Sequence, residues 1–470
     1  MRREMTAWSR AGVRTLAAAG LLAIAACDLT DSLLEVKDPD IINPDDVQNA
    51  EGAIALANGA LDFFRNTTGG NESTWLFGGL LADEWSTSST FVQNDETDQR
   101  KIQTNNSTIT GMFRDLARTR LGANLAIRGL KQYSPDPPRR IAEVYFARGF
   151  AEMQMAQDFC NGIPLSEIEG DVIIPGEPLT VAEVFQRAIA SYDSAIAVLA
   201  SNTDTSQAAG SARSIRRAAL VAKARAMVGL NQVAQAAALV DSIPLSFAYN
   251  HTFAITSGDN ILWSQPASAR RYTVGDSLEG NARRDTVRNA IPFFTAQDPR
   301  LPVTYTIAAN GRDTVKSQDG QTNSRTTTLY GRTTSVPVVN GLDARLIAAE
   351  ARLRTGDYAG MMTILNGLRA SPPRLGEVQP PAMAALPVPA DSASAVSLYF
   401  REKAFWTFSR GQRLGDLRRL MRQYGRSEDN TFPVGTHYKG GVYGDDVNLP
   451  VPKNEEGNNP NFQGCLDRNA

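Results

Sequence analysis

Two pairs of adjacent alanine-rich segments constrain the fold of this chain more than any other feature of its sequence. Residues 213–229 are followed by 232–242, and residues 342–355 are followed by 358–369. In each pair a glycine, Gly229 or Gly356, interrupts the helical spacing of apolar residues. Glycine readily ends a helix, so the pattern predicts helix–turn–helix units like those of tetratricopeptide repeats. The interval between the pairs is irregular, which excludes a regular solenoid and leaves two unrelated helical hairpins as an alternative.

Helical spacing of apolar residues extends well beyond these pairs. It is clear in residues 110–132 and 139–159, and in the segment that follows Thr180, where a glutamate occupies the capping-box position. An earlier helix is expected to open at residues 43–46 (NPDD), which offer a cap and first-turn acids, and to run through Phe64. The fold class predicted from these patterns is mostly α, with the helical hairpins as its scaffold.

Four stretches of different composition interrupt the helical patterns. They are rich in Thr, Ser, Asn, Gly and Arg and contain short β-prone pieces; they cover residues 70–108, 244–340, 371–391 and 426–448. Long irregular segments on a compact helical scaffold usually carry function. We therefore expect one helical domain over 45–470 in which these insertions are functional or mobile.

The N-terminus has the form of a bacterial export signal that ends at a lipidated cysteine. Four arginines precede a short apolar run over 15–26, which is too short to span a bilayer. The run stops at Ile24-Ala25-Ala26-Cys27, which resembles a lipobox. We therefore predict a signal peptide over 1–26, a lipid on Cys27 and a tether over 27–44. An ordinary secretory signal with a chance cysteine is the alternative.

The charge balance and the cysteines limit the partners, cross-links and metal sites that the chain can have. Removal of residues 1–26 takes four arginines and one glutamate from a chain of 48 basic and 50 acidic residues, which leaves it weakly acidic and argues against a nucleic-acid partner. In an exported chain the two remaining cysteines, Cys160 and Cys465, are expected to form a disulfide, with two buried free thiols as the alternative. Zinc is not indicated, since no CxxC or Cys/His cluster occurs.

Four segments of the sequence, taken in order, carry a resemblance to a known family. They are the opening DPDIINPDDVQNAEGAIALANGALDFF, the helix and turn ARGFAEMQMAQDFCNGIPLSE, the late pair REKAFWTFSRGQRLGDLRRL with Arg401-Glu402 and Asp416-Leu417-Arg418-Arg419, and the closing VNLPVPKNEEGNNPNFQGC. Together they cover nearly the whole chain, which resembles the SusD/RagB family of outer-membrane nutrient-uptake lipoproteins.

That resemblance implies a fold and a role. It implies a SusD-like helical domain whose insertions bind glycans, or in some members peptides. It implies a lipid anchor at the cell surface and a partner, a SusC-like TonB-dependent barrel of the outer membrane, into which the ligand is delivered. It implies binding without cleavage and no cofactor.

Signatures of catalysis and of metal binding are sparse. The two histidines, His251 and His437, are expected to be polar residues of surface loops, and no HExxH, GxSxG, SxxK, Walker or GxGxxG motif is present. Asp83-Glu84 is the most suggestive carboxylate pair for glycoside hydrolysis, but a solvated turn is the preferred interpretation. The acidic run 94–98 is interpreted as a solvated loop rather than a calcium site. We predict no catalytic residue and no metal ligand.

Residues suited to sugar binding combine flat aromatic rings with hydrogen-bonding side chains. Two insertions offer this mixture. The first contributes Trp75, Trp85 and Phe91 with Asn71, Asn94 and Asp95, and the second contributes Trp263 and Tyr272 with Arg270 and Arg271. For each aromatic residue a core-filling role is the alternative, and Phe405 and Trp406, which lie in a strong helical pattern, are assigned to the core.

The sequence thus predicts a substrate-binding lipoprotein of a TonB-linked importer, anchored in the outer membrane and exposed at the cell surface. The second hypothesis is an envelope scaffold lipoprotein that holds another protein through its tetratricopeptide-like pairs. The third is a glycan-cleaving enzyme.

Overall fold

The computed structural model describes residues 48–470 apart from 71–72 and 170–171, and Asn49–Ala470 form one compact unit. The predicted export signal, Cys27 and the tether lie outside the described residues. Among the helices that are described, none is both long and apolar enough to cross a membrane.

Helices make up nearly half of this unit and most of its regular secondary structure, as predicted. The longer ones are α3 (Ala50–Gly69), α6 (Ser107–Tyr133), α7 (Pro138–Asp158), α8 (Val181–Val198), α9 (Ala212–Gly229), α12 (Gly341–Arg354), α13 (Tyr358–Ala370), α14 (Ser392–Trp406) and α15 (Arg413–Tyr424). The shorter ones are α4 (Thr74–Ala82), α5 (Val92–Asp98), α10 (Val233–Val240), α11 (Ile261–Trp263) and η2 (Ser264–Ser268), a single π-helical turn.

Local signals set the helix starts. The side chain of Asn49 accepts the Gly52 N–H at 2.8 Å and caps α3, so the helix begins later than the expected start at 43–46 and continues past Phe64 to Gly69. The capping box before α8 is confirmed: Thr180 Oγ1 accepts the Glu183 N–H, and the Glu183 carboxylate accepts the Thr180 N–H.

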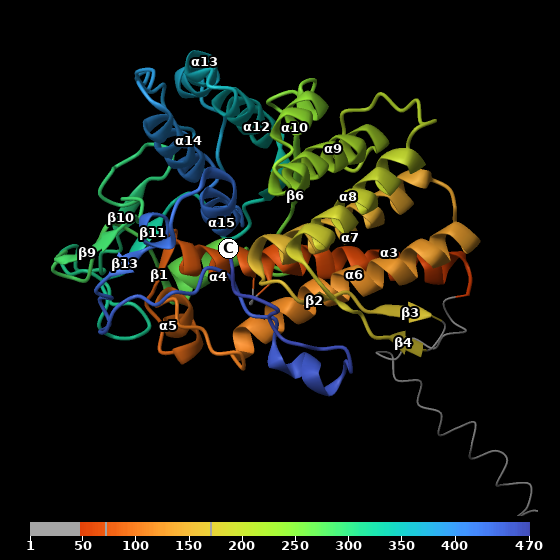
Figure 1. The fold of residues 1–470 in the computed structure, drawn as a ribbon, viewed down its shortest axis with the longest axis horizontal. Helices are drawn as coiled ribbons and strands as arrows, with labels where there is room; N and C mark the ends of the chain where they lie inside the picture. The colour runs from red at the N-terminus through yellow and green to blue at the C-terminus, as the bar shows by residue number, and fades with distance from the viewer. Residues whose placement is uncertain (1–47, 71–72, 170–171) are drawn as a thin grey trace, which may run out of the picture. The chain divides into compact units, whose positions relative to one another are not determined.

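Helices that follow one another in the sequence lie side by side, from α6 through α10, and α3 packs along α6 and α7 (Figure 1). The two alanine-rich pairs of the sequence are α9/α10 and α12/α13. Both α9 and α10 pack against α12, so the pairs stack on each other. The alternative of two unrelated hairpins is therefore wrong.

The strands are short and come mostly from the insertions. They are β1 (Trp85–Thr87), β2 (Ile163–Pro164), β3 (Glu167–Glu169), β4 (Val172–Ile174), β5 (Pro178–Leu179), β6 (Ala248–His251), β7 (Tyr272–Val274), β8 (Leu278–Glu279), β9 (Asp285–Arg288), β10 (Val303–Tyr305), β11 (Arg325–Thr327), β12 (Val336–Asn340) and β13 (Val434–Gly435). All pairings between them are antiparallel, and they form two- or three-stranded sheets.

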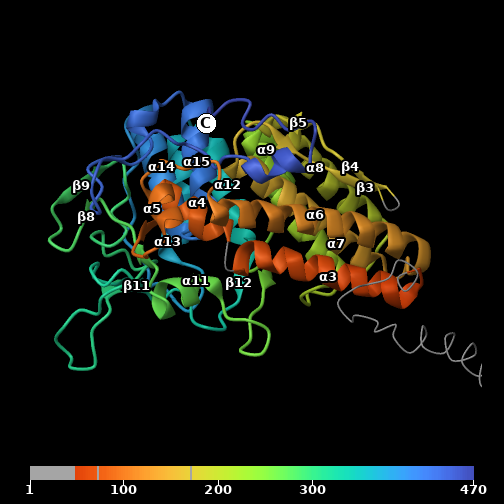
Figure 2. The ribbon, with the colours of Figure 1, turned by 90° about the horizontal axis from the view of Figure 1, so that it is seen from below.

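Strand pairing fixes where the insertions leave and rejoin the helical scaffold. Because β6 pairs with β12, the segment between them is one long excursion that begins after α10 and ends at the start of α12. In Figures 1 and 2 the strands β8, β9 and β11 of this excursion lie away from α3, α6 and α7, on the side of α5. The stretch 70–108 is less irregular than expected because it contains α4, α5 and β1, whereas 371–391 lacks helices and strands.

The predicted disulfide between Cys160 and Cys465 is present, with a Cα–Cα distance of 5.6 Å and a sequence separation of 305 residues. It joins the end of the α7 segment to the C-terminal tail. The tail is also held by the isolated bridges Phe159–Leu449 and Asn161–Asp467. The alternative of two buried free thiols is therefore excluded.

Candidate functional site

A surface groove of about 610 Å³ lies where the first two insertions meet. This volume is in the range of small-molecule sites. Four parts of the chain line it: α4, the start of α5 with the residue before it, the start of α6, and the segment from η2 to β7. The lining residues are Phe77, Phe91, Gln93, Asn94, Ser107, Thr108, Gln265, Arg271 and Tyr272.

Antiparallel pairing of β1 with β7 brings the two insertions together. Thr87 stands opposite Tyr272, and just beyond this pair the Ser88 N–H donates to the Arg271 carbonyl at 2.9 Å. Main-chain hydrogen bonds therefore join the two insertions beside the groove, so they are not two independent loops. Of the residues predicted to bind ligand, this pairing places Asn94, Arg271 and Tyr272 beside Phe91 at one site.

Phe91 supplies the apolar surface of the groove. It precedes α5 as the N-cap residue, and 42% of its surface is exposed, which is unusual in a chain whose other large rings are mostly buried. The Arg271 guanidinium lies over the ring, with Cζ 4.8 Å from the ring centroid. Phe77 and Tyr272 contribute ring edges from the core side, being 1% and 3% exposed.

Polar side chains surround this ring. Asn94 is buried, and its side-chain amide has no hydrogen-bond partner among the described residues, so its donors and its acceptor remain available. Gln93, Ser107 and Thr108 lie on the same wall, and Gln265 accepts a hydrogen bond from Arg271 Nη1 at 3.2 Å. An aromatic surface bordered by amides and hydroxyls is the combination that sugar rings require.

Trp75 and Trp85 are not available to a ligand, so their assignment to the binding surface is wrong. Trp75 is 0% and Trp85 1% exposed. Trp85 donates its indole N–H to Ser409 Oγ at 3.0 Å and packs against Phe408, with ring centroids 5.0 Å apart. Both rings belong to the core, as do Phe405 and Trp406, whose core assignment is confirmed.

The other predicted binding residues lie outside the groove. Trp263 is half-buried, and Arg332, rather than a groove residue, faces its ring with Cζ 6.0 Å from the centroid. Asp95 accepts hydrogen bonds from Thr87 Oγ1 and Lys439 Nζ, both at 2.8 Å. Arg270 is not among the residues that line the groove, and Asn71 lies outside the described residues.

The carboxylate pair Asp83 and Glu84 is buried, so the interpretation as a solvated turn is wrong. Asp83 forms a two-pronged ion pair with Arg413, at 2.7 and 2.8 Å, and accepts the Ile291 N–H. Glu84 accepts the Ser409 N–H at 2.8 Å, and burial raises its pKa to about 8, against the lowering effect of that hydrogen bond. Both groups hold elements together and do not face the groove.

The acidic run 94–98 and the two histidines are also structural. The run forms α5 rather than a loop, and Asp98 accepts the Thr87 N–H at 2.7 Å and faces His437 Nε2 at 3.2 Å. Both His251 and His437 are buried rather than exposed, and burial lowers the pKa of His251 to about 3. In the part of the chain that the structure describes, no group of three or more His, Cys, Asp or Glu side chains could hold a metal ion.

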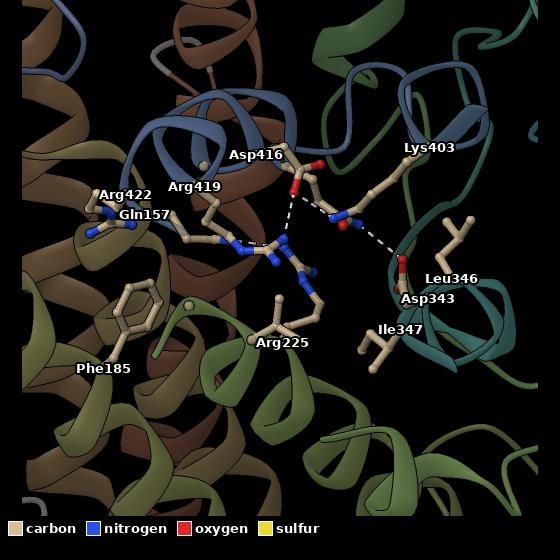
Figure 3. Close-up of a pocket in the computed structure, with 14 residues that line it drawn as sticks. Gln157, Phe185, Arg225, Asp343, Leu346, Ile347, Lys403, Asp416, Arg419 and Arg422 are labelled. Carbon is tan, nitrogen blue, oxygen red and sulfur yellow. Dashed lines mark hydrogen bonds and ion pairs between the residues drawn. The ribbon is translucent and has the colours of Figure 1, made fainter. Parts of the chain in front are cut away.

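A second cavity lies inside the protein, between α9, α12 and α15 (Figure 3). Its volume is about 20 Å³, room for one water molecule and too little for a ligand. Asp416 accepts hydrogen bonds here from Lys403 Nζ at 2.6 Å and Arg419 Nη1 at 3.2 Å, while Asp343 accepts two from Arg410. Charged groups of this cavity link helices to one another, so the surface groove is the better candidate for a ligand site.

Comparisons with known proteins bear on the fold. No family model matches the sequence, and no curated protein matches it. Solved structures do match. A SusD superfamily protein from Bacteroides vulgatus aligns with a TM-score of 0.61 at 15% identity, over 89% of this chain and 99% of that one.

Two further structures align comparably. The surface glycan-binding protein A from Bacteroides uniformis has a TM-score of 0.60 at 14% identity, over 88% of this chain and 99% of that one. A SusD-like carbohydrate-binding protein from Bacteroides fragilis has a TM-score of 0.60 at 13% identity, over 89% and 100%. The resemblance seen in the sequence is thus confirmed for the architecture, and this chain has the SusD-like fold.

Proposed function

We propose that this protein captures glycans at the cell surface and that the groove beside Phe91 is the binding site. The single observation that carries the proposal is the groove itself, where an exposed ring, amides and hydroxyls from two distant insertions converge. The names of the aligned structures, surface glycan-binding protein and SusD-like carbohydrate-binding protein, support a sugar rather than another ligand.

The groove is suited to holding a sugar without cleaving it. Glycoside hydrolysis requires two carboxyl groups on either side of the scissile bond. None of the described residues that line the groove is Asp or Glu, and the pair suggested by the sequence is engaged in the core. We therefore propose binding as the activity, with the sugar released unaltered.

The direct test is glycan binding by variants of the exposed ring. A glycan array followed by calorimetry should identify a ligand whose affinity falls about ten-fold in Phe91→Ala, since stacking on an aromatic ring contributes on the order of 1 kcal/mol. Phe63→Ala is the matched control, because Phe63 is 38% exposed but lies on α3, away from the groove lining. Equal loss in both variants, or no loss in Phe91→Ala, would contradict the proposal.

We further propose that a lipid on Cys27 anchors the protein in the outer membrane and that it delivers its ligand to a SusC-like TonB-dependent barrel. The lipobox-like sequence and the family resemblance support this part. Mass spectrometry of Cys27 tests the anchor, and co-purification of a large barrel protein from detergent extracts tests the partner. An unmodified cysteine, or a purified protein without a barrel, argues against it.

One surface favours a protein partner of some kind. Strand β4 pairs only with β3 among the described strands, and its Val172, Ile173 and Ile174 are 61%, 65% and 42% exposed. Three consecutive exposed apolar residues on an edge strand are typical of an interaction surface. If a partner protein binds this strand, Ile173→Asp would abolish partner binding while Phe91→Ala would change nothing. The scaffold hypothesis drawn from the sequence places the partner on the tetratricopeptide-like pairs instead.

A further inference from the structure

We infer that the groove is selective for acidic glycans and that Arg271 recognises their anionic group, the carboxylate of a uronic acid or a sulfate ester. This inference rests on the proposed function and names the class of sugar. It starts from the charge of the groove, whose described lining contains one arginine and no acidic residue. An anionic ligand would meet a fixed positive charge there and no repelling carboxylate.

Arg271 has no carboxylate partner among the described residues, a property that it shares with the buried Arg418, whose guanidinium donates to the Ala156 and Gln157 carbonyls. Arg413, Arg300 and Arg410 each form an ion pair with a buried carboxylate, at 2.7 to 2.8 Å. Among the described residues, the guanidinium of Arg271 donates instead to the neutral amide oxygen of Gln265. The Nε of Arg271 is buried without a hydrogen-bond partner. A half-buried guanidinium with unused donors favours an anion supplied from outside.

The main chain of Arg271 is fixed by hydrogen bonds, and its guanidinium contacts Gln265 Oε1 and the Phe91 ring. The Arg271 N–H donates to the Gln265 carbonyl at 3.0 Å, and its own carbonyl accepts the Ser88 N–H at 2.9 Å. Gln265 lies in the π-helical turn η2, and Arg270 has a φ of 55°, a left-handed conformation that is uncommon for a residue other than glycine. Irregular backbone of this kind is concentrated at ligand sites.

Phe91 and Arg271 together form a composite wall. The guanidinium covers one face of the ring, yet the residue keeps 42% of its surface exposed. A sugar that packs on the exposed part of Phe91 places its substituents within reach of the arginine, whose planar fork matches a carboxylate or a sulfate group. Asn94, with its unused side-chain amide, is positioned to bind the hydroxyls of the same sugar.

The test compares matched ligands on the chain from Asp28 onward without its lipid, which contains the whole compact unit Asn49–Ala470. Calorimetry would measure an oligogalacturonide, its methyl ester, in which each carboxylate is neutralised, and a sulfated galactan oligosaccharide. One of the two anionic ligands should bind at least about ten-fold more tightly than the ester, since hydrogen bonds to charged groups contribute more than neutral ones. Which of the two binds identifies the anionic group.

Arg271→Gln should lower the affinity for the anionic ligand roughly ten- to hundred-fold, a larger factor than its effect on the affinity for the ester. Arg312→Gln is the matched control, because it removes the same charge from an exposed loop outside the groove lining. Equal affinity for acid and ester, or an unchanged affinity in Arg271→Gln, would overturn the inference. If the inference failed in this way but Phe91→Ala still abolished glycan binding, the proposed function would stand. If no glycan of any kind bound, the inference and the proposed function would both be wrong.

Discussion

At the scale of single residues, the sequence could name the right residue types but not which of them are exposed. Asn94, Arg271 and Tyr272 were predicted to bind ligand, and all line the groove. Trp75 and Trp85 also stand among polar residues in the sequence, as the groove residues do. They are nevertheless buried, because α4 and β1 pack against α15 and the loop that precedes it. Burial of this kind depends on contacts some 320 residues away in the sequence (Trp85 to Ser409), which no local pattern reports.

Five further groove residues were not predicted: Phe77, Gln93, Ser107, Thr108 and Gln265. A glutamine carries no sequence signal of its own, and Gln265 enters the groove only because the π-helical turn η2 precedes β7. Asp83 and Glu84 were misjudged for the same reason as the tryptophans, since their partners, Arg413 for Asp83 and the Ser409 N–H for Glu84, lie far along the chain. Side-chain chemistry was readable from the sequence, and side-chain environment was not.

The raised pKa of Glu84 gives a prediction at this scale. Burial favours its protonated form, so between an unfolded pKa of 4.5 and a folded pKa of about 8 the folded state binds the extra proton. The free energy of unfolding should therefore fall as pH rises through this window, by up to about 1.4 kcal/mol per pH unit from this group. Glu84→Gln removes this titration. In urea denaturation, the free energy of unfolding of the variant should therefore rise relative to that of the wild type from pH 5 to pH 8.

The exposed Glu456→Gln is the control for that measurement, because this side chain lies at the surface and its loss should leave the pH profile parallel to that of the wild type. Parallel profiles for wild type and Glu84→Gln would mean that Glu84 is ionised in the folded protein.

At the scale of elements, the helical hairpins were predictable and the way they join was not. The glycine-interrupted pairs appear as α9/α10 and α12/α13 because apolar spacing and helix ends are local properties. What joins them to the late helices is a buried charge network. Arg419 of α15 pairs with Glu350 of α12, and Tyr399 and Tyr424 also donate hydrogen bonds to Glu350.

This network explains the Asp416-Leu417-Arg418-Arg419 motif, which the sequence showed only as a family resemblance. Burial alone would raise the pKa of Glu350, but the Arg419 guanidinium holds it below its ordinary value, so the carboxylate stays charged in the core. Arg418 is also buried and donates hydrogen bonds to the Ala156 and Gln157 carbonyls at the end of α7. The motif therefore fastens α15 to two other helices.

Arg419→Met should destabilise the protein by about 3–5 kcal/mol, because it leaves the Glu350 carboxylate buried without its cation. The loss should be measured as a fall in the free energy of unfolding in urea. Arg352→Met is the control: it breaks the ion pair between Arg352 of α12 and Asp357, the N-cap residue of α13, whose side chains are 60% and 40% exposed, and should cost less than about 1 kcal/mol. Similar losses in the free energy of unfolding for both variants would show that the buried ion pair stabilises the protein no more than an exposed one.

At the scale of the whole molecule, fold class and disulfide could be predicted, whereas the meeting of two insertions could not. Helical periodicity, together with four family-like segments in the correct order, was sufficient to predict the SusD-like fold. The groove, however, depends on the pairing of β1 with β7, two three-residue strands from distant parts of the chain. Strands this short have too little alternation to be recognised, and their register is set by tertiary packing.

The disulfide is a global constraint, since it closes a loop of 305 residues. In the chain-entropy model, a loop of this length corresponds to about 5 kcal/mol of stabilisation. Treatment with a reductant should therefore lower the melting temperature of the wild type and release the C-terminal tail to limited proteolysis. The double variant Cys160→Ser/Cys465→Ser should melt at the reduced temperature with or without reductant, and a reductant-sensitive double variant would contradict this explanation.

The central claim is that a glycan binds where the two insertions meet, and amide hydrogen exchange with and without the tightest-binding glycan tests it most directly. The account predicts slower exchange in both 88–98 and 264–273, the segments that carry Phe91, Asn94, Gln265 and Arg271, with α12 and α13 unchanged. Protection confined to the helical hairpins or to β4, with neither groove segment affected, would contradict it.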